Sequence, residues 1–380
     1  MKIALSFPGC HRRGGVERVV YECAGFLAQR QHDVTVYAEE WEEGDRRGVR
    51  YHRVAVRRQP GFLRGASYFR KCTEALAHER YEVLNTHGAV CPTGGVQWVQ
   101  SVHRAWLERC REFRAPFSPA RIRQRLNPLH PVILRLEATH FRERRYRKLI
   151  ATTAQVRADL ERFYGVPAAD VEVIPNGFSP TEFNPERRAE RRAAMREKLG
   201  LRPDDIALLF VANELDRKGF ATILGAMRIL SAPRLRLLAI GRPSAAAIQR
   251  GAARFGLAGQ VTACGPTSDV AAYHAAGDLF VLPTQYEAFS LAILESLGSG
   301  LPVITSEVPG ARDAIRPGEN GALIRDPQNA EELAAALAPL LDETRRAALT
   351  ATTPATAHAY RWPTVLTHYE RVLTAHRHGN

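Results

Sequence analysis

The strongest constraint on the fold is that short apolar runs alternate with amphipathic helical patterns along nearly the whole chain. Residues 2–7 form an apolar run that ends in Pro8-Gly9, and a helical pattern precedes a second run at 33–38. Further strands are predicted at 49–56, 83–86, 96–102 and 171–174. Strands that alternate with helices predict an α/β protein with mainly parallel, doubly wound sheets.

The second half of the chain repeats this pattern. Strands are predicted at 206–211, 236–240, 261–264, 279–282, 303–305 and 322–324, with helical segments between them. We expect an N-terminal Rossmann-like domain over 1–175, a C-terminal Rossmann-like domain over 176–360, and a last helix over 361–380 that packs back on the N-terminal domain. Two such sheets facing a central cleft bind ligands at the carboxyl ends of their strands.

The positive charge of the chain is concentrated in its first half. The chain has 53 Lys and Arg against 40 Asp and Glu, and residues 1–170 hold 30 of the basic and 18 of the acidic side chains. The basic helical segment 104–148 alone holds 13 basic and 4 acidic residues, interleaved with apolar and aromatic ones. This pattern suits an anionic membrane surface or an anionic lipid-linked acceptor. A solvated basic face is the alternative.

Several classes of protein are disfavoured by the sequence. No apolar run approaches the roughly 18 residues that span a bilayer. No secretory signal is visible, so a cytoplasmic location is expected. The six cysteines include no Cys-x-x-Cys pair, which argues against a zinc site and favours buried thiols. Nucleic acid is not expected as a partner, because no zinc, aromatic ribonucleoprotein or helix-turn-helix motif accompanies the basic charge.

The segment from Glu287 to Glu295 is the most informative one for chemistry. If a helix begins near Ser290, the backbone amides of Phe289, Ser290 and Leu291 point out of its amino end and form an anion site that fits a diphosphate. Glu287 then precedes the helix, and Glu295 lies about one and a half turns into it. The alternative is a simple cap contact for Glu287 and a solvated helix position for Glu295.

This segment and several others resemble the retaining glycosyltransferases of family 4, which have the two-domain GT-B fold. The Glu-x7-Glu spacing with the following Ser-Gly-Leu-Pro-Val-Ile resembles the donor-site signature of that family. Gly14-Gly15 resembles its first glycine loop, and Gly265 with Asp269 and Tyr273 resembles its middle block. The resemblance extends to the subgroup of lipopolysaccharide core glucosyltransferases.

The resemblance implies roles for individual residues. Glu287 would contact the donor sugar and Glu295 the ribose, while Phe289, Ser290 and Leu291 would bind sugar and phosphate through their amides. His103 would stand beside the donor sugar as a catalytic residue. Further donor-side candidates are Gly14, Gly15 and Gly265, and the acceptor-side candidates are His87 and Arg104, with His87 the weaker one because it can simply shape its loop.

Arg217 and Lys218 follow a predicted strand and precede a helix. Two adjacent cations on such a loop can neutralise the charge that builds on a departing nucleoside diphosphate, and the resemblance supports a catalytic role for both. The Gly-Arg-Leu commonly found upstream in the family is Ala212-Asn213-Glu214 here, which leaves one cation fewer. A solvated loop is the alternative for the Arg-Lys pair.

These observations predict an enzyme that needs no metal or other cofactor. No Asp-x-Asp triplet is present to clamp a divalent metal on a diphosphate. We expect a retaining glycosyltransferase that moves a sugar, UDP-hexose being the guessed donor, to a saccharide or lipid-linked acceptor. The expected setting is cell-envelope or lipopolysaccharide biosynthesis at the inner face of the cytoplasmic membrane. The alternatives are a nucleotide-sugar epimerase, a phosphorylase, or a non-catalytic basic scaffold that binds membranes.

Overall fold

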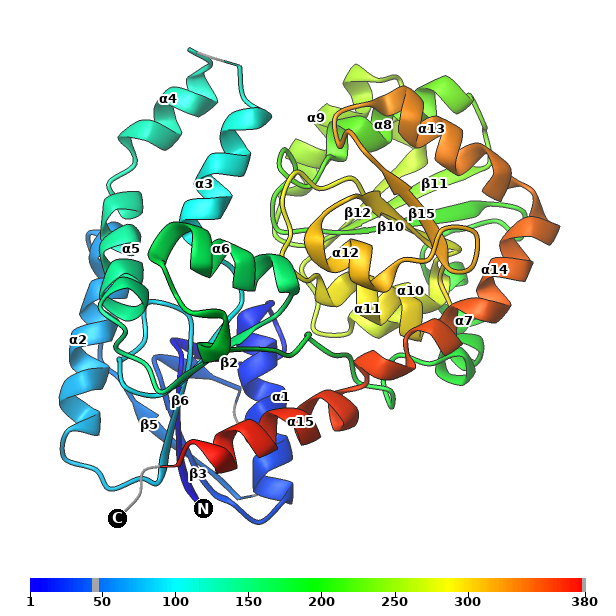
Figure 1. Cartoon of the computed structure of the whole chain (residues 1–380). Coiled ribbons are helices and arrows are strands. Elements are labelled where there is room, and N and C mark those ends of the chain that lie inside the picture. Colours follow the sequence, from blue (N-terminus) through cyan, green and yellow to red (C-terminus); the bar gives the residue numbers. More distant parts are fainter. Residues whose placement is uncertain (43–47, 116, 378–380) are drawn as a thin grey trace. The chain divides into compact units, whose positions relative to one another are not determined.

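The structure is a computed structural model that describes residues 1–42, 48–115 and 117–377 of the chain. The chain divides into two compact units, one formed by Met1–Asn176 with the residues from Pro363 onward, the other by Gly177–Trp362. Each unit is built on a parallel sheet with helices on its faces (Figure 1). The α/β class expected from the alternating pattern is therefore confirmed.

The N-terminal unit contains a seven-stranded sheet in the order β5-β3-β1-β6-β7-β8-β9. Its strands are β1 (Lys2–Ser6), β3 (Asp33–Ala38), β5 (Val49–Arg53), β6 (Val83–His87), β7 (Val96–Val99), β8 (Lys148–Ala151) and β9 (Val171–Val173). A separate pair is formed by β2 (Gly9–Cys10) and β4 (Glu40–Trp41). Because β1 lies between β3 and β6, the winding of the chain reverses at β1.

The helices of this unit follow the strands in alternation. They are α1 (Val16–Gln29), α2 (Arg64–Leu76), α3 (His103–Glu112), α4 (Pro119–Leu126), α5 (Leu129–Glu137), α6 (Ala154–Tyr164) and α15 (Trp362–Ala375). Helix α15 packs on this unit, since the Tyr369 hydroxyl donates to Asn85 Oδ1 at 2.9 Å and Glu370 Oε1 lies 2.7 Å from His32 Nε2. In Figure 1 the α3–α4 pair extends away from the sheet.

The C-terminal unit contains a six-stranded sheet in the order β12-β11-β10-β13-β14-β15. The strands are β10 (Ile206–Val211), β11 (Leu235–Ile240), β12 (Val261–Gly265), β13 (Leu279–Leu282), β14 (Val303–Ser306) and β15 (Gly321–Ile324). The central strands β10, β13 and β14 are buried on both faces, which explains why their sequences read as continuous apolar runs, whereas the edge strands β12 and β15 are partly half-buried. The winding reverses at β10, so the loops after β10 and β13 start at neighbouring strand ends.

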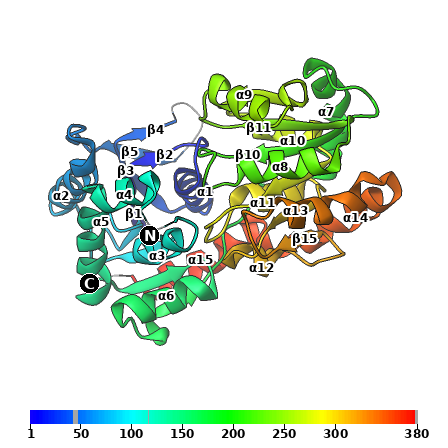
Figure 2. The same ribbon diagram turned by 90° about the horizontal axis from the view of Figure 1, so that it is seen from above.

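Eight helices of the C-terminal unit surround this sheet in the views of Figures 1 and 2. They are α7 (Pro185–Lys198), α8 (Phe220–Leu230), α9 (Ala245–Arg254), α10 (Val270–Ala276), α11 (Leu291–Gly298), α12 (Pro309–Ala314), α13 (Ala330–Leu337) and α14 (Glu343–Thr356). Two arginines of α7 fix this helix to the C-terminal unit. Arg192 and Arg196 form ion pairs with Asp278 and donate hydrogen bonds to carbonyl groups at the end of α10. These cations offset the negative end of the α10 dipole.

No helix among the described residues is long and apolar enough to cross a membrane. Cys10, Cys23, Cys72, Cys91 and Cys110 are buried, and Cys264 is half-buried. Within the described part of the chain, no group of three or more His, Cys, Asp or Glu side chains is arranged to hold a metal ion.

Candidate donor site and histidine site

The predicted donor residues of the C-terminal unit gather on two loops at its winding reversal. One loop, 212–219, follows β10, and the other, 283–290, follows β13. The Arg217 carbonyl accepts from the Gln285 amide at 2.9 Å and from the Thr284 hydroxyl at 3.4 Å. These bonds fix the two loops to each other.

Gly219 makes the close approach of the two loops possible. Its φ of +77° is a left-handed conformation, and a Cβ atom at this position would lie 2.1 Å from the Pro283 carbonyl oxygen. Only glycine meets both requirements without displacing the neighbouring backbone. The turn therefore holds Arg217 and Lys218 in contact with the loop that carries Glu287.

Three charged side chains predicted from the sequence meet here. The Lys218 ammonium contacts the Glu287 carboxylate, and both side chains are largely buried, with exposed fractions of 13% and 22%. Arg217 donates through Nη1 to the Tyr286 carbonyl at 2.7 Å and is held by Glu214 at 3.0 Å through Nε. Residues from two separate loops thus form one polar site with two cations and two carboxylates.

Helix α11 places its amino end beside this site. The amides of the first turn have no intrahelical partners, and the side chain of the N-cap residue Ser290 makes no cap hydrogen bond to them. Gly310 supports the loop before the helix: its amide donates to the Ala288 carbonyl at 2.8 Å, and a Cβ atom there would lie 2.5 Å from that oxygen. Glu295 is only 5% exposed, so it is a buried helix residue and not a solvated one.

Glycines also shape the neighbouring strand ends. Gly265 ends β12 with a φ of +71°, and its carbonyl accepts from the Gly241 amide at 3.0 Å. A Cβ atom on Gly241 would lie 1.8 Å from the Ala212 carbonyl oxygen. Sequence reasoning identified Gly265 but missed Gly241, Glu214 and Thr284. A glycine directly after the apolar run 236–240 was the available signal for Gly241.

The first glycine loop lies in the N-terminal unit, before α1. Gly15 is the N-cap residue of α1 and faces open space. Gly14 is close to the Glu17 carboxylate, which a Cβ atom would meet at 2.3 Å. The structure thus places both glycines at the amino end of α1, and the packing of Glu17 constrains Gly14 alone.

His87, an acceptor-side candidate from the sequence, is the last residue of β6 and lies in the interior. Its side chain is fully buried and its ring packs against Trp98 at a centroid distance of 5.9 Å. Neither ring nitrogen has a hydrogen-bond partner among the described residues. Burial lowers the pKa of His87 to about 3, so the ring is neutral at pH 7. The alternating strand pattern could not reveal that β6 is covered on both faces.

His103 is the first residue of α3 and belongs to a cluster of rings. Its Nε2 atom lies 3.1 Å from His130 Nδ1, and its ring stacks on Trp106 at a centroid distance of 5.2 Å. Burial, reinforced by His130, lowers the pKa of His103 to about 4. The adjacent Arg104 places its guanidinium 5.8 Å from the centre of the Phe163 ring.

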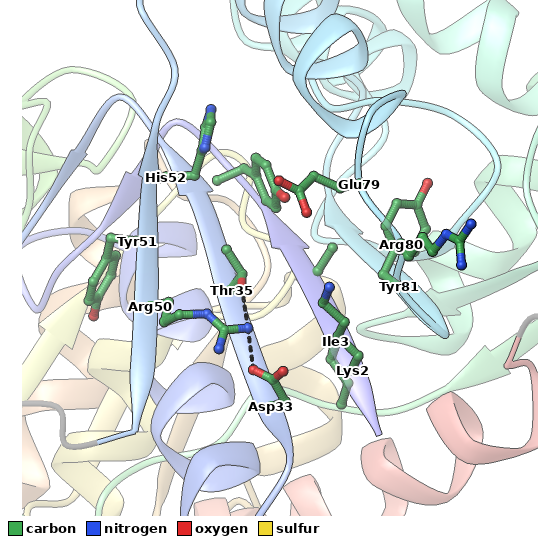
Figure 3. Close-up of a pocket in the computed structure, with 12 residues that line it drawn as sticks. Lys2, Ile3, Asp33, Thr35, Arg50, Tyr51, His52, Glu79, Arg80 and Tyr81 are labelled. Atoms are coloured by element: carbon green, nitrogen blue, oxygen red, sulfur yellow. Dashed lines mark hydrogen bonds and ion pairs between the residues drawn. The ribbon is translucent and has the colours of Figure 1, made fainter.

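A separate hollow of about 460 Å³ opens on the N-terminal sheet (Figure 3). It is lined by residues of β1, β3 and β5 with the 79–81 turn, and Arg50 bridges it by contacts to Asp33 and, at 3.3 Å, to the Thr35 hydroxyl. None of the site residues predicted from the sequence lines this hollow.

Two protein-family models match this chain. The family model for Glycosyltransferase Family 4 matches residues 13–182, and the model for Glycosyl transferases group 1 matches residues 191–353. The chain belongs to the GT-B glycosyltransferases. The first match covers most of the N-terminal unit, and the second contains both loops of the polar site.

Curated relatives of this glycosyltransferase act on different acceptors. The D-inositol 3-phosphate glycosyltransferase of Rhodococcus jostii (strain RHA1) is 33% identical over 228 residues, 57% of this chain and 49% of the relative. The chain thus spans about half the length of that relative. The lipopolysaccharide glucosyltransferase WaaG of Escherichia coli (strain K12) is 25% identical over 325 residues, 84% of each chain.

Solved structures establish the fold of this glycosyltransferase. A crystal structure of WaaG, a glycosyltransferase involved in lipopolysaccharide biosynthesis, matches with a TM-score of 0.85 at 22% identity, over 98% of this chain and 99% of that one. Anabaena Alr3699/HepE in complex with UDP and glucose matches with a TM-score of 0.74 at 18% identity, over 99% of this chain and 100% of that one. The GT-B fold predicted from the sequence is confirmed.

Proposed function

We propose that this glycosyltransferase transfers a hexose from a UDP-sugar to a saccharide or lipid-linked acceptor, with retention of configuration and without a metal ion. The place of the reaction is cell-envelope or lipopolysaccharide biosynthesis. The name of the Escherichia coli relative and the UDP and glucose in the Anabaena complex support this choice. The observation that carries the proposal is the joint position of Arg217, Lys218 and Glu287 beside the amino end of α11.

Each group in this site has a task in the proposed reaction. Arg217 and Lys218 stabilise the diphosphate as it leaves, and the amides at the amino end of α11 bind its oxygens. Glu287 neutralises Lys218 before the donor arrives and accepts hydrogen bonds from the sugar hydroxyls once the phosphates have engaged the lysine. Glu295 binds the ribose, and Gly265 keeps the adjoining strand end free of side chains.

The acceptor hydroxyl attacks the anomeric carbon from the face that the leaving group departs from. The bond between that carbon and the diphosphate oxygen breaks, the new glycosidic bond forms, and the departing phosphate oxygen takes the proton of the acceptor hydroxyl. His103 and the Gly14-Gly15 loop contribute from the N-terminal unit. Two cations and a helix terminus supply the positive charge that a divalent metal would otherwise provide.

We place the reaction at an anionic membrane surface because of the tip of the α3–α5 segment. Phe117 is 90% exposed and Leu126 73% exposed, and Ile122 on the same helix as Leu126 is 48% exposed. The exposed arginines Arg123 and Arg125 stand beside them on α4. Apolar side chains next to cations bind the boundary between lipid head groups and acyl chains, provided that the lipid is anionic.

A thermal-shift panel of UDP-, GDP- and ADP-sugars identifies the donor, since a ligand of the folded state raises the melting temperature. We expect UDP-hexoses to raise it most. Release of UDP that requires a saccharide acceptor and persists in EDTA is the expected result of an activity assay. Conversion of the sugar without an acceptor would instead indicate an epimerase, release of a sugar phosphate on addition of inorganic phosphate a phosphorylase, and failure to bind any nucleotide sugar a scaffold.

A further inference from the structure

Glu137 connects the two ends of the helical segment that begins with His103. Its carboxylate accepts from the His103 amide at 2.6 Å and from the Arg104 amide at 3.3 Å, and the Tyr164 hydroxyl donates to it at 2.6 Å. The side chain is only 2% exposed. A buried carboxylate that receives three hydrogen bonds at the amino end of α3 fixes that helix end firmly.

His130 contacts His103 through its imidazole ring. Its Nδ1 atom lies 3.1 Å from His103 Nε2, and Trp106 packs against both imidazoles. Burial lowers the pKa of both histidines, so both rings are neutral at pH 7. In a neutral pair one nitrogen donates and the other accepts, so the tautomer of His103 is coupled to that of His130.

The remaining nitrogen of His103, Nδ1, has no hydrogen-bond partner among the residues that the structure describes. Its chemical character follows from the tautomer. If His103 Nε2 carries the proton, Nδ1 is an acceptor; if His130 Nδ1 carries it, His103 Nδ1 is a donor. The contact with His130 therefore decides what His103 can offer to a bound molecule.

We propose that Glu137 and His130 are positioning residues for His103, Glu137 through the backbone at the start of α3 and His130 through the imidazole. The inference rests on the proposed function, in which His103 stands next to the transferred sugar. It adds two residues that touch no substrate themselves. Misplacing a reacting group by about 1 Å can cost roughly a hundredfold in rate, so such supports are expected to affect turnover strongly.

Substitutions of His130 separate positioning from packing. The side-chain amide of asparagine reaches the place of imidazole Nδ1, so His130→Asn retains a group that can hydrogen-bond to His103, whereas His130→Ala does not. We expect His130→Ala to lower kcat tenfold or more with an unchanged KM for the donor, and His130→Asn to keep most of the wild-type kcat. The exposed His78, changed to Ala, is the matched control with unchanged kinetics.

Substitution of Glu137 tests the backbone contact. Glu137→Gln keeps one carbonyl oxygen but points an amide N–H₂ at a backbone N–H, so one of the two contacts with α3 is lost. We expect kcat to fall tenfold or more. The circular dichroism spectrum at 20 °C should equal that of the wild type, which shows that the variant is folded. Glu143→Gln, an exposed change a few residues further along, is the control.

The ¹⁵N chemical shifts of the histidine rings provide a readout that does not depend on turnover. We expect one dominant tautomer of His103 in the wild type and in His130→Asn, and a mixture in His130→Ala. Equal tautomer populations in all three proteins, or wild-type kcat in both His130→Ala and Glu137→Gln, would overturn the inference. If His103→Ala itself keeps full turnover, the proposed role of His103 fails, while the ¹⁵N shifts still decide whether His130 sets its tautomer.

Discussion

At the scale of single residues, Lys218 is the group on which the proposed chemistry depends most. Its ammonium is largely buried against Glu287, so removing it takes away a preorganised positive charge and not a solvated one. We predict that Lys218→Ala lowers kcat by roughly a hundred- to a thousandfold. The measurement is UDP release in the presence of acceptor, with the melting temperature recorded in parallel.

The exposed Lys198 at the end of α7 offers a control for this substitution, because Lys198→Ala removes the same charge from a residue that belongs to neither loop. Its turnover is expected to equal that of the wild type. Near-normal turnover of Lys218→Ala would contradict the assignment of this lysine to the leaving group.

A second prediction at this scale concerns Gly219. Gly219→Ala introduces a methyl group 2.1 Å from the Pro283 carbonyl oxygen at a φ of +77°, so one of the two loops must move. We expect a loss of about 1 to 3 kcal/mol in the free energy of unfolding and a weaker affinity for UDP. Both are measured by chemical denaturation and by titration with UDP.

Gly200→Ala separates the cost of the left-handed backbone conformation from the cost of the close contact with the other loop. Gly200 has a similar φ of +67° but nothing within 4 Å of the added methyl group, so Gly200→Ala carries the conformational cost alone. If the two variants lost equal stability and bound UDP equally well, the close approach of the loops would not matter for the site.

At the scale of elements, the tip of the α3–α5 segment carries a prediction about membranes. Replacing Phe117 and Leu126 together by serine removes the two most exposed apolar side chains of this tip. We expect binding to vesicles with a third of anionic lipid to fall at least tenfold, with turnover on a soluble acceptor unchanged. Co-sedimentation at graded salt measures the binding.

Zwitterionic vesicles and the exposed pair Lys71→Ser and Glu74→Ser on α2 are the controls for that experiment. The wild type should bind anionic vesicles more weakly as salt rises, because the arginine contribution is screened. If the serine substitutions left vesicle binding unaltered, the tip would not be the surface that binds the membrane.

At the scale of the whole molecule, buried histidines of the N-terminal unit predict how stability depends on pH. Burial lowers the pKa of His87 to about 3 and that of His140 to about 4, against 6.5 when exposed. The unfolded chain therefore binds more protons than the folded one below pH 6.5. The free energy of unfolding should fall as the pH drops from 6.5 to about 4, by up to about 1.4 kcal/mol per pH unit for each group.

Tryptophan fluorescence follows this loss, because Trp41, Trp98 and Trp106 all belong to the N-terminal unit. His140→Gln should flatten the pH dependence, since a glutamine amide can still donate to the Cys91 carbonyl, to which His140 Nε2 lies at 2.9 Å. A free energy of unfolding that stays constant between pH 6.5 and 4.5 would contradict the neutral state of these rings.

The sequence was informative wherever local chemistry alone determines the structure. The strands 206–211 and 279–282 were predicted with their observed bounds, because strands buried on both faces read as uninterrupted apolar runs. Strand β8 was missed, since its four residues begin with a lysine and follow a run of arginines. The pairs β2 and β4 were missed because two-residue strands carry no periodicity.

For the site, the sequence brought out the residues whose role is carried by a local motif. Lys218 and Glu287 were selected on separate motifs, and the structure brings them into contact. Glu137 and His130 could not be predicted from the sequence, because a single glutamate or histidine within an amphipathic helix belongs to no motif that indicates its function. Their importance arises from contacts with His103 across about 30 positions of the chain.

The contact between His103 and Glu137 closes a loop whose ends lie 34 positions apart in sequence and 2.6 Å apart in space. A segment anchored in this way can be lengthened, shortened or exchanged at its tip while the sheet beneath it stays unchanged, because doubling a flexible loop costs only about 0.6 kcal/mol of closure entropy. The part of the segment that can be exchanged is therefore its tip between α3 and α5, and not the helix ends that carry His103, His130 and Glu137. Under the proposed function, exchange of this tip would change the acceptor preference and leave the loops 212–219 and 283–290 unchanged.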